Sequence, residues 1–507
     1  MQSRIDSKRI ARNSIVLYFR MLFQMVVFLY SSRVVLAALG VEDYGIYDVV
    51  AGLILMLSFL NNSLISCSQR FITYAIGKNN SQYLQEVCSA SIFVHLLMAF
   101  LVFVLAETIG LWYVIDVMVY PHEKFWEVMM VYQCSLLSGL FLIVSIPYNA
   151  LIIAYERMNA FALITTADAV MKLLAAMTLG CLSEGYRLVS YSLMMLLVAT
   201  ITRLAYAMYC NHNFPVLRFQ IRNNKEILKE MYSFFSWSIM GNTSIAMNTQ
   251  GLNLVLNYFF GPVLNASRGV AFQIQMAVTQ FIASFQMAVN PQITKSYAQG
   301  NLSLTNSLVL RSSRLSFMLV LFMAIPLFIE APTVLQVWLG KIPEHSINIL
   351  RLLLLVSVVD AVSNPLMVAA AATGKIKKYQ IYVGGTLMSV LPISVLLLQF
   401  FKIPECVFVV LFSVTLFVQC IRVWLCRNLF ALNVREYVTD VVARIVLTCV
   451  LAIFVPVILS TYLIGTSLIA LIIRVVLDLI WIALIAIIFG LKKDERAYIL
   501  NKIGLQI

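Results

Sequence analysis

Apolar stretches of roughly 20 residues recur along the whole chain, and they constrain its fold more than any other feature. At about 1.5 Å per residue, each stretch is long enough as a helix to cross a hydrocarbon layer about 30 Å thick. Hydrophobic residues make up 61% of the 507 positions and charged residues only 12%, which leaves too few polar side chains to cover a water-facing surface. We therefore expect an all-α polytopic membrane protein with about 14 transmembrane helices.

The basic residues indicate how the chain is oriented. Arg4, Lys8, Arg9 and Arg12 precede an apolar run that is too long for a cleavable signal peptide, so we expect a cytoplasmic N-terminus. With that orientation roughly 26 of the Lys and Arg residues fall on cytoplasmic ends or loops, as the positive-inside rule requires. An even number of spans returns the C-terminus to the cytoplasm. The net charge of +13 is explained in this way, and it does not indicate a nucleic-acid partner.

Matching landmarks suggest that the first six spans were duplicated. They recur about 220 residues apart: Leu39-Gly40 with Phe260-Gly261, Tyr74 to Gly77 with Tyr297 to Gly300, and Pro147 with Arg157 against Pro365 with Lys375. The alternative is coincidence, because Gly and Pro are frequent in membrane helices. An even number of spans per copy makes the repeat parallel, and such lobes usually enclose a central cavity. The expected organisation is an N-lobe at 1–210, a cytoplasmic linker at 211–231, a C-lobe at 232–430 and two extra C-terminal helices at 431–507.

Three expected helices each have one polar face within an apolar sequence. At 100° per residue, these faces hold Asn13, Arg20, Gln24 and Ser31 in the helix near 14–37, Asn242, Thr249, Asn253 and Asn257 near 232–258, and Arg268, Gln275, Thr279, Gln286 and Asn290 near 264–290. Polar groups that face lipid cost several kcal/mol each, so we expect these faces to line a cavity. Hydrogen bonding between helices is the alternative for the amides. Arg20 and Arg268 lie inside the bilayer, where charge is normally functional unless the long side chain reaches the interface.

Carboxylates within the spans divide into paired and unpaired groups. Asp168 lies four residues before Lys172, and the same spacing relates Asp440 to Arg444 and Arg474 to Asp478. We interpret the last two pairs as structural and keep Asp168 and Lys172 as cavity candidates. Asp48 and Asp360 have no oppositely charged residue three or four positions away. Each is expected either to carry a coupling ion or to pair with an arginine across the cavity.

The nine cysteines and four histidines show no metal-ligand spacing, so neither a metal site nor a cofactor is expected. No nucleophile and base constellation is recognisable either. A transporter is therefore favoured over an enzyme.

Several segments resemble the polysaccharide transporters that flip O-antigen and related lipid-linked glycans. They are LGVEDYGIYDVVAG and SQRFITYAIGKNN in the first third, SIPYNALIIAYERMNAFA, and GPVLNASRGVAFQIQ with NPQITKSYAQGN later. The resemblance covers essentially the whole chain. It implies membership of the superfamily of multidrug and toxin extruders and lipid II flippases, two six-helix lobes around a central cavity, and a bacterial inner membrane. It also implies that arginines matching Arg20 and Arg268 bind the diphosphate of a polyprenyl carrier. A further Arg–Asp pair of the lipid II flippases is missing from MLFQMVVFLYSSRVV, which speaks against lipid II itself as substrate.

The expected function is translocation of an undecaprenyl-diphosphate-linked oligosaccharide by alternating access. Arg20 and Arg268 would bind the diphosphate, while Gln24 and the amides Asn242, Asn253, Gln275, Gln286 and Asn290 would line the cavity. A glycan polymerase and a chain-length protein are the expected partners. Two alternatives stay open: cation-coupled export of drugs by the same fold, and a polytopic membrane enzyme of glycan assembly.

Overall fold

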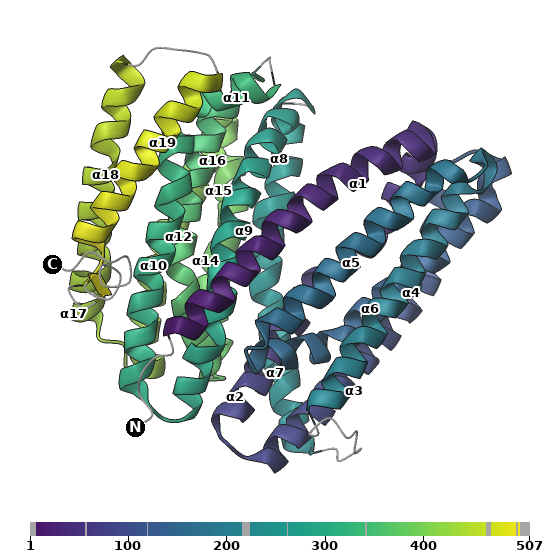
Figure 1. The fold of residues 1–507 in the computed structure, drawn as a ribbon, viewed down its shortest axis with the longest axis horizontal. Helices are drawn as coiled ribbons and strands as arrows, with labels where there is room; N and C mark the ends of the chain where they lie inside the picture. The colour runs from purple at the N-terminus through teal and green to yellow at the C-terminus, as the bar shows by residue number, and fades with distance from the viewer. Residues whose placement is uncertain are drawn as a thin grey trace. The chain divides into compact units, whose positions relative to one another are not determined.

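The computed structural model describes residues 7–55, 58–118, 120–214, 224–260, 262–339, 342–462, 468–492 and 495–496. These residues form helices and contain no strand, which confirms the expected all-α fold. Figure 1 shows the ribbon. The chain separates into two compact units, Met1–Asn242 and Thr243–Ile507, which we describe separately. The expected boundaries at 210, 231 and 430 stay predictions, and residues 215–223 of the expected linker lie outside the described residues.

The first unit is built from helices that begin and end as follows: α1 Ser7–Leu55, α2 Ser58–Gly77, α3 Ser81–Leu105, η1 Ala106–Gly110, η2 Tyr113–Val117, η3 His122–Lys124, α4 Phe125–Ala154, α5 Met158–Thr178, η4 Leu179–Cys181, η5 Glu184–Tyr186, α6 Arg187–Asn213 and α7 Lys225–Ala246, whose last turn belongs to the second unit. Gly40 interrupts α1 with a φ of 76°, a conformation that costs glycine little. The expected break between the first two spans therefore lies inside α1. Helices α1, α4, α5 and α6 pack on one another.

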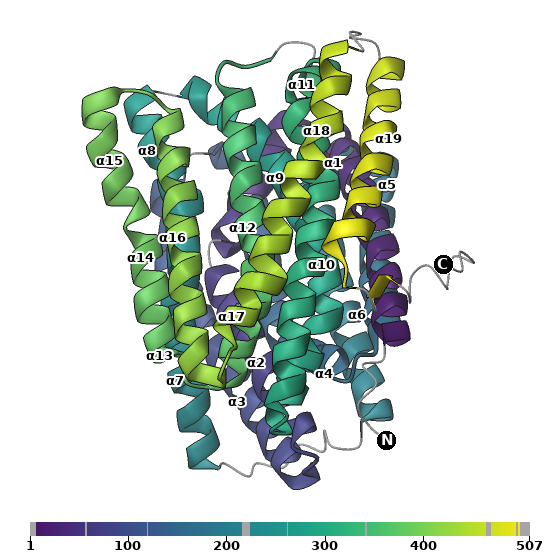
Figure 2. The same ribbon diagram turned by 90° about the vertical axis from the view of Figure 1, so that its left-hand side faces the viewer.

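The second unit continues with η7 Met247–Gly251, α8 Leu252–Phe260, α9 Pro262–Ala298, α10 Leu302–Ile329, α11 Ala331–Leu339, α12 Ser346–Ala372, α13 Ile376–Tyr379, η8 Gln380–Gly384, α14 Gly385–Met388, α15 Val390–Phe401, α16 Glu405–Phe430, α17 Val434–Tyr437, η9 Val438–Val442, α18 Ala443–Tyr462, α19 Leu468–Ile485 and η10 Ala486–Gly490. Helix α12 packs against α9, α10 and α16. Figure 2 shows α10, α12 and α16 running alongside one another, with α18 next to α10.

Among the described residues, ten helices are long and apolar enough to cross a membrane. They correspond to the third to sixth and ninth to fourteenth expected spans. Large apolar side chains such as Phe400, Phe417 and Phe454 are exposed on α15, α16 and α18, as lipid contact requires. The expected first, second, seventh and eighth spans are outside this set of ten.

Turn geometry supports the internal repeat. Asn79 between α2 and α3 has a φ of 53°, and Gly300 between α9 and α10 has a φ of 76°. Each is followed by an asparagine that caps the next helix: Asn80 Oδ1 accepts from the Tyr83 amide at 3.0 Å, and Asn301 Oδ1 accepts from the Leu304 amide at 2.9 Å.

The second matching turn follows the proline-containing helices α4 and α12. Glu156 has a φ of 58° and Gly374 a φ of 75°, and each precedes the first residue of the following helix by two positions. The backbone carbonyl after each proline accepts a thiol hydrogen bond: Cys210 Sγ donates to Tyr148 at 3.5 Å, and Cys426 Sγ donates to Leu366 at 3.7 Å. The landmark pair at Pro147 and Pro365 is thus matched in three dimensions. Gly261, the partner of Gly40, lies outside the described residues.

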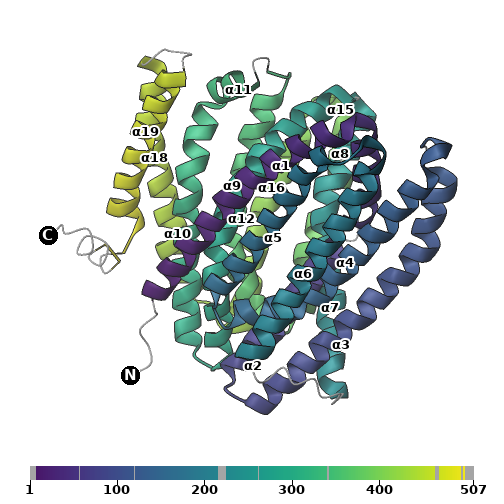
Figure 3. The ribbon, with the colours of Figure 1, turned by 45° about the vertical axis from the view of Figure 1, so that its right-hand side comes forward.

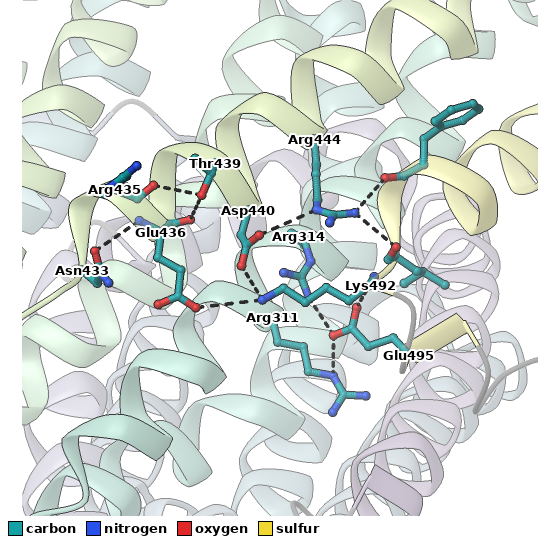
Figure 4. A network of polar contacts seen from close by, with 12 residues as sticks. Arg311, Arg314, Asn433, Arg435, Glu436, Thr439, Asp440, Arg444, Lys492 and Glu495 are labelled. Atoms are coloured by element: carbon teal, nitrogen blue, oxygen red, sulfur yellow. Dashed lines mark hydrogen bonds and ion pairs between the residues drawn. The ribbon is translucent and has the colours of Figure 1, made fainter.

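The C-terminal helix pair α18–α19 packs against α10 (Figure 3). A charged network anchors its ends to α10 and to η9 (Figure 4). Glu495 accepts from Arg311 at 3.3 Å and from Arg314 at 2.7 Å, while Lys492 pairs with Asp440. The expected pair of Asp440 with Arg444 is present at 4.0 Å. The two extra helices are thereby attached to the second unit.

Candidate functional site

The first unit places Arg20 of α1 against α5. Its side chain is only 7% exposed, and the guanidinium carbon lies 4.6 Å from the centre of the Phe161 ring. Such a cation–π contact stabilises a buried guanidinium without neutralising it. Arg20 therefore lies within the helix bundle, where its side chain is held by Phe161 rather than by the membrane interface.

Polar groups of α5 and α6 lie next to Arg20. Lys172 Nζ is 2.8 Å from Asp168 Oδ2, as the four-residue spacing predicts, and the Thr202 hydroxyl donates to Asp168 Oδ1 at 3.0 Å. Tyr206 on α6 interacts electrostatically with both Arg20 and Asp168. Tyr206 thus lies within electrostatic range of both charges, while a joint site of Arg20, Asp168 and Lys172 stays a prediction.

Several polar atoms in the two turns of α1 before Arg20, and in Arg20 itself, are buried without a hydrogen-bond partner. They are Asn13 Nδ2, Ser14 Oγ and Arg20 Nε. One helical turn beyond Arg20, Gln24 Nε2 donates to the Thr165 carbonyl at 3.0 Å. Unsatisfied buried donors are costly, and their accumulation around a guanidinium is typical of a site that receives acceptor oxygens. Among the described side chains, no carboxylate pairs with Arg20.

The second unit contains Arg268 at the start of α9. Its side chain is buried, donates to the Thr249 carbonyl and lies 5.2 Å from the Phe272 ring centre. Thr249 belongs to the π-helical segment η7, where the regular helical hydrogen bonding is interrupted and carbonyls become available to other donors. Here too, no described carboxylate pairs with the guanidinium.

The amides chosen as cavity residues mostly bind neighbouring helices. Gln275 Nε2 donates to the Leu353 carbonyl and to Ser357, each at 3.2 Å. Gln286 is buried, and its amide donates to the Ala361 carbonyl at 3.1 Å. The alternative of interhelical hydrogen bonding therefore holds for both glutamines in this structure. Their cavity-lining role stays a prediction.

The asparagines of the polar faces differ from one another. Asn242 Nδ2 donates to Ser63 on α2 at 2.7 Å. Asn290 is partly exposed, and its Oδ1 is buried without a hydrogen-bond partner, while Asn253 is partly exposed on α8. Asn257 lies outside the described side chains. Whether any of them contacts a cargo stays a prediction.

Of the two aspartates without a helical partner, the structure describes the side chain of Asp360 but not that of Asp48. Asp360 on α12 is exposed and faces the buried Arg422 of α16, with which it interacts electrostatically. Whether Asp360 carries a coupling ion or pairs with an arginine across a cavity stays a prediction. The side chain of Asp48 lies outside the described residues, so its role stays a prediction.

Sequence reasoning overlooked several polar residues within the spans. Tyr206 and Arg422 were not selected, nor was Arg203, whose guanidinium lies 4.2 Å from the Tyr148 ring centre. A simple signal would have found both arginines, because each is a lone cation within an apolar span. Among the described residues, no three His, Cys, Asp or Glu side chains come together as a metal site.

Comparison with solved structures identifies the fold. A crystal structure of a MATE protein in the bent conformation has a TM-score of 0.72 at 16% identity, covering 85% of this chain and 96% of that one. The outward-facing conformation of a multidrug resistance MATE family transporter of the MOP superfamily gives 0.69 at 17% identity, with 85% and 96% covered. The chain has the fold of these MATE structures. Another transporter with this fold, from Pyrococcus furiosus Vc1, was described as having a binding pocket of reverse polarity that suggests a different function; its TM-score is 0.70 at 15% identity, with 85% and 96% covered. No family model and no curated protein matches the sequence.

The MOP fold accounts for the expected architecture. It confirms the expected helical fold with two lobes, and the structure in the outward-facing conformation is that of a transporter. At this level of identity the comparison establishes the fold alone.

Proposed function

We propose that this chain is a membrane transporter that moves a polyprenyl-diphosphate-linked oligosaccharide across the bacterial inner membrane. The observation that carries the proposal is the buried Arg20, whose Nε has no hydrogen-bond partner and which has no described carboxylate partner. Arg268, buried in the second unit, provides a second guanidinium without a described carboxylate partner, although it donates to the Thr249 carbonyl. The MOP fold supports a transporter, and the arginines support an anionic cargo.

The charge around Arg20 distinguishes an anionic cargo from a cationic one. Asp168, which shares Tyr206 as a neighbour with Arg20, is already neutralised by Lys172 at 2.8 Å. The remaining charge in this cluster is therefore the positive charge of Arg20. A cationic drug would be repelled by this charge, whereas the two phosphates of a diphosphate would be attracted to it, more strongly in a low-dielectric environment than in water.

Guanidinium chemistry suits a diphosphate. Arginine stays protonated at any physiological pH and binds phosphate oxygens through two parallel N–H donors. Asn13 Nδ2 and Ser14 Oγ add further donors on the same helix. The partly exposed amides Asn253 and Asn290 suit the hydroxyl groups of the attached sugars.

A flipping assay in proteoliposomes tests the proposal. We expect wild-type protein to move a fluorescent polyprenyl-diphosphate oligosaccharide between leaflets, and we expect the double variant Arg20→Gln, Arg268→Gln to lose this activity while keeping its melting temperature. Arg435→Gln, which removes an exposed guanidinium outside both sites, is the matched control. Wild-type rates in the double variant would refute the cationic site.

Export of cationic drugs is the second candidate, and the multidrug resistance transporter among the structural neighbours favours it. This reading requires Asp168 to bind the drug in place of Lys172. A dye-efflux assay separates the two: activity on a lipophilic cation that is abolished by Asp168→Asn and unaffected by Arg20→Gln would replace the flippase proposal with the exporter.

The remaining assignments follow from the flippase proposal. Both termini are placed in the cytoplasm by the distribution of basic residues, and a glycan polymerase with a chain-length protein is the expected partner. Ion coupling through Asp360 is tested by Asp360→Asn, because unchanged dependence on the proton or sodium gradient in this variant would exclude that role.

A further inference from the structure

Three ionisable residues are almost completely buried where α19 meets the end of α10. Arg474 is 4% exposed, Asp478 is 1% exposed, and Glu330, the C-cap residue of α10, is 3% exposed. Arg474 Nη2 donates to Glu330 Oε2 at 2.8 Å. Sequence analysis paired Arg474 with Asp478, whereas the structure pairs it with a carboxylate from another helix. Asp478 Oδ1 is buried without a hydrogen-bond partner.

Among the described residues of the surrounding helices, only Arg474 forms an ion pair with either carboxylate. Helix α11 has no charged residue, and Arg444 of α18 donates to the carbonyls of Phe489 and Leu491 at the opposite end of α19. On α10, Arg314 contacts Glu495, far along the helix from Glu330. On α12, Arg351 donates to the Phe328 carbonyl. The two carboxylates therefore share one ion-paired guanidinium, and Asp478 is the carboxylate that has no ion pair.

A buried carboxylate that has no ion pair is not stable in its charged form. An isolated ionised carboxylate in a low-dielectric interior costs so much free energy that it takes up a proton. Glu330 is stabilised in its ionised form by the ion pair with Arg474, so the proton belongs on Asp478, which has no such contact. A metal cation is disfavoured, because Arg474 would repel it.

We propose that Asp478 is a proton-binding residue of the transport cycle. Arg474 pairs with Glu330 while Asp478 holds the proton, and it pairs with Asp478 after the proton has left. In the state described here, Arg474 bonds to Glu330 and Asp478 is protonated. In the second state, Asp478 has released its proton and Arg474 bonds to it within α19, four residues away, while Glu330 takes up one proton. Each exchange breaks or re-forms the Arg474–Glu330 ion pair, which joins α19 to the end of α10. This inference rests on the proposed transporter function and names a coupling ion for it.

Infrared difference spectroscopy tests proton binding without any transport. The full-length protein in lipid is measured at stepped pH, and we expect a carboxylic acid C=O band that shifts when all aspartates carry ¹³C. The band is expected to disappear in Asp478→Asn and to persist in the control Asp440→Asn, which alters the carboxylate of the network in Figure 4. The labelled wild-type protein alone decides the test if a variant does not fold: an unshifted band, or no band, overturns the proposal.

Transport measurements then test the coupling. We expect Asp478→Asn to flip cargo at a rate that no longer responds to an imposed proton gradient, while Asp440→Asn responds as the wild type does. A full response to the gradient in Asp478→Asn overturns the coupling role. If neither wild type nor variant moves the diphosphate-linked cargo, the proposed function fails, while the infrared result stands by itself.

Discussion

The two halves of the repeat have the same turns and different polar chemistry. Aligning α6 with α16 through Cys210 and Cys426 places Tyr206 opposite Arg422. In the first half, the buried guanidinium comes from α1, and Tyr206 lies beside it. In the second half, Arg422 occupies the position equivalent to Tyr206 and interacts electrostatically with the carboxylate of Asp360. The comparison suggests that the backbone turns were kept after duplication, and that Arg422, unlike Arg20 and Arg268, lies within electrostatic range of a carboxylate.

Arg20 and Arg422 should therefore respond differently to the same substitution. Loss of charge-assisted hydrogen bonds to a phosphate removes about 1.5–3 kcal/mol of binding, which corresponds to roughly a 10- to 100-fold slower transport for Arg20→Gln. Its unfolding free energy should change little, because no described carboxylate depends on Arg20. Rates come from the flipping assay, and stability from unfolding of the solubilised protein.

Arg422→Gln should show the reverse pattern. It leaves Asp360 without its facing cation, and we expect the unfolding free energy to fall by about 1–3 kcal/mol with transport per folded molecule largely kept. Both arginines behaving alike in the two measurements would break the distinction between the halves.

Sequence reasoning recovered the scaffold better than the contacts. Apolar periodicity fixes the helices, and turn residues such as Gly300 and Pro365 reveal the repeat, because both signals are local in sequence. The partner of Arg474 was missed because Glu330 lies 144 residues away. The glutamines Gln275 and Gln286 were assigned to a cavity, since helical periodicity shows that a face is polar but does not show whether a neighbouring helix covers it.

The matched turns at Asn79 and Gly300 allow a test of the repeat itself. Gly300→Val should lower the unfolding free energy by about 1–2 kcal/mol, because a β-branched residue is strained at positive φ. Crowding is not the cause, since a Cβ atom at this position would meet no heavy atom of the described residues within 4 Å. Asn79→Gly should be neutral or slightly stabilising. A destabilisation by Asn79→Gly equal to that of Gly300→Val would show that the two turns are not equivalent.

The helix caps after these turns should be equivalent in energy. Asn80→Ala and Asn301→Ala each remove one side-chain acceptor from an amide of the first helical turn, and each should cost about 1 kcal/mol. Replacement by Asp or Ser should restore most of the loss at both positions. Unequal losses in thermal or chemical unfolding would mean that only one half depends on its cap.

The smallest effect is expected at the charged network that anchors the C-terminal helices of the second unit. Lys492 pairs with Asp440, but both are partly exposed, so Lys492→Gln should cost at most about 1 kcal/mol. Because salt screens exposed ion pairs, the difference in melting temperature from wild type should shrink at high ionic strength. Lys375→Gln, at an exposed position next to the matched turn after α12, is the control and should show no salt-dependent difference. An effect of Lys492→Gln that persists in high salt would instead indicate that the lysine anchors the C-terminal helices through packing of its aliphatic chain.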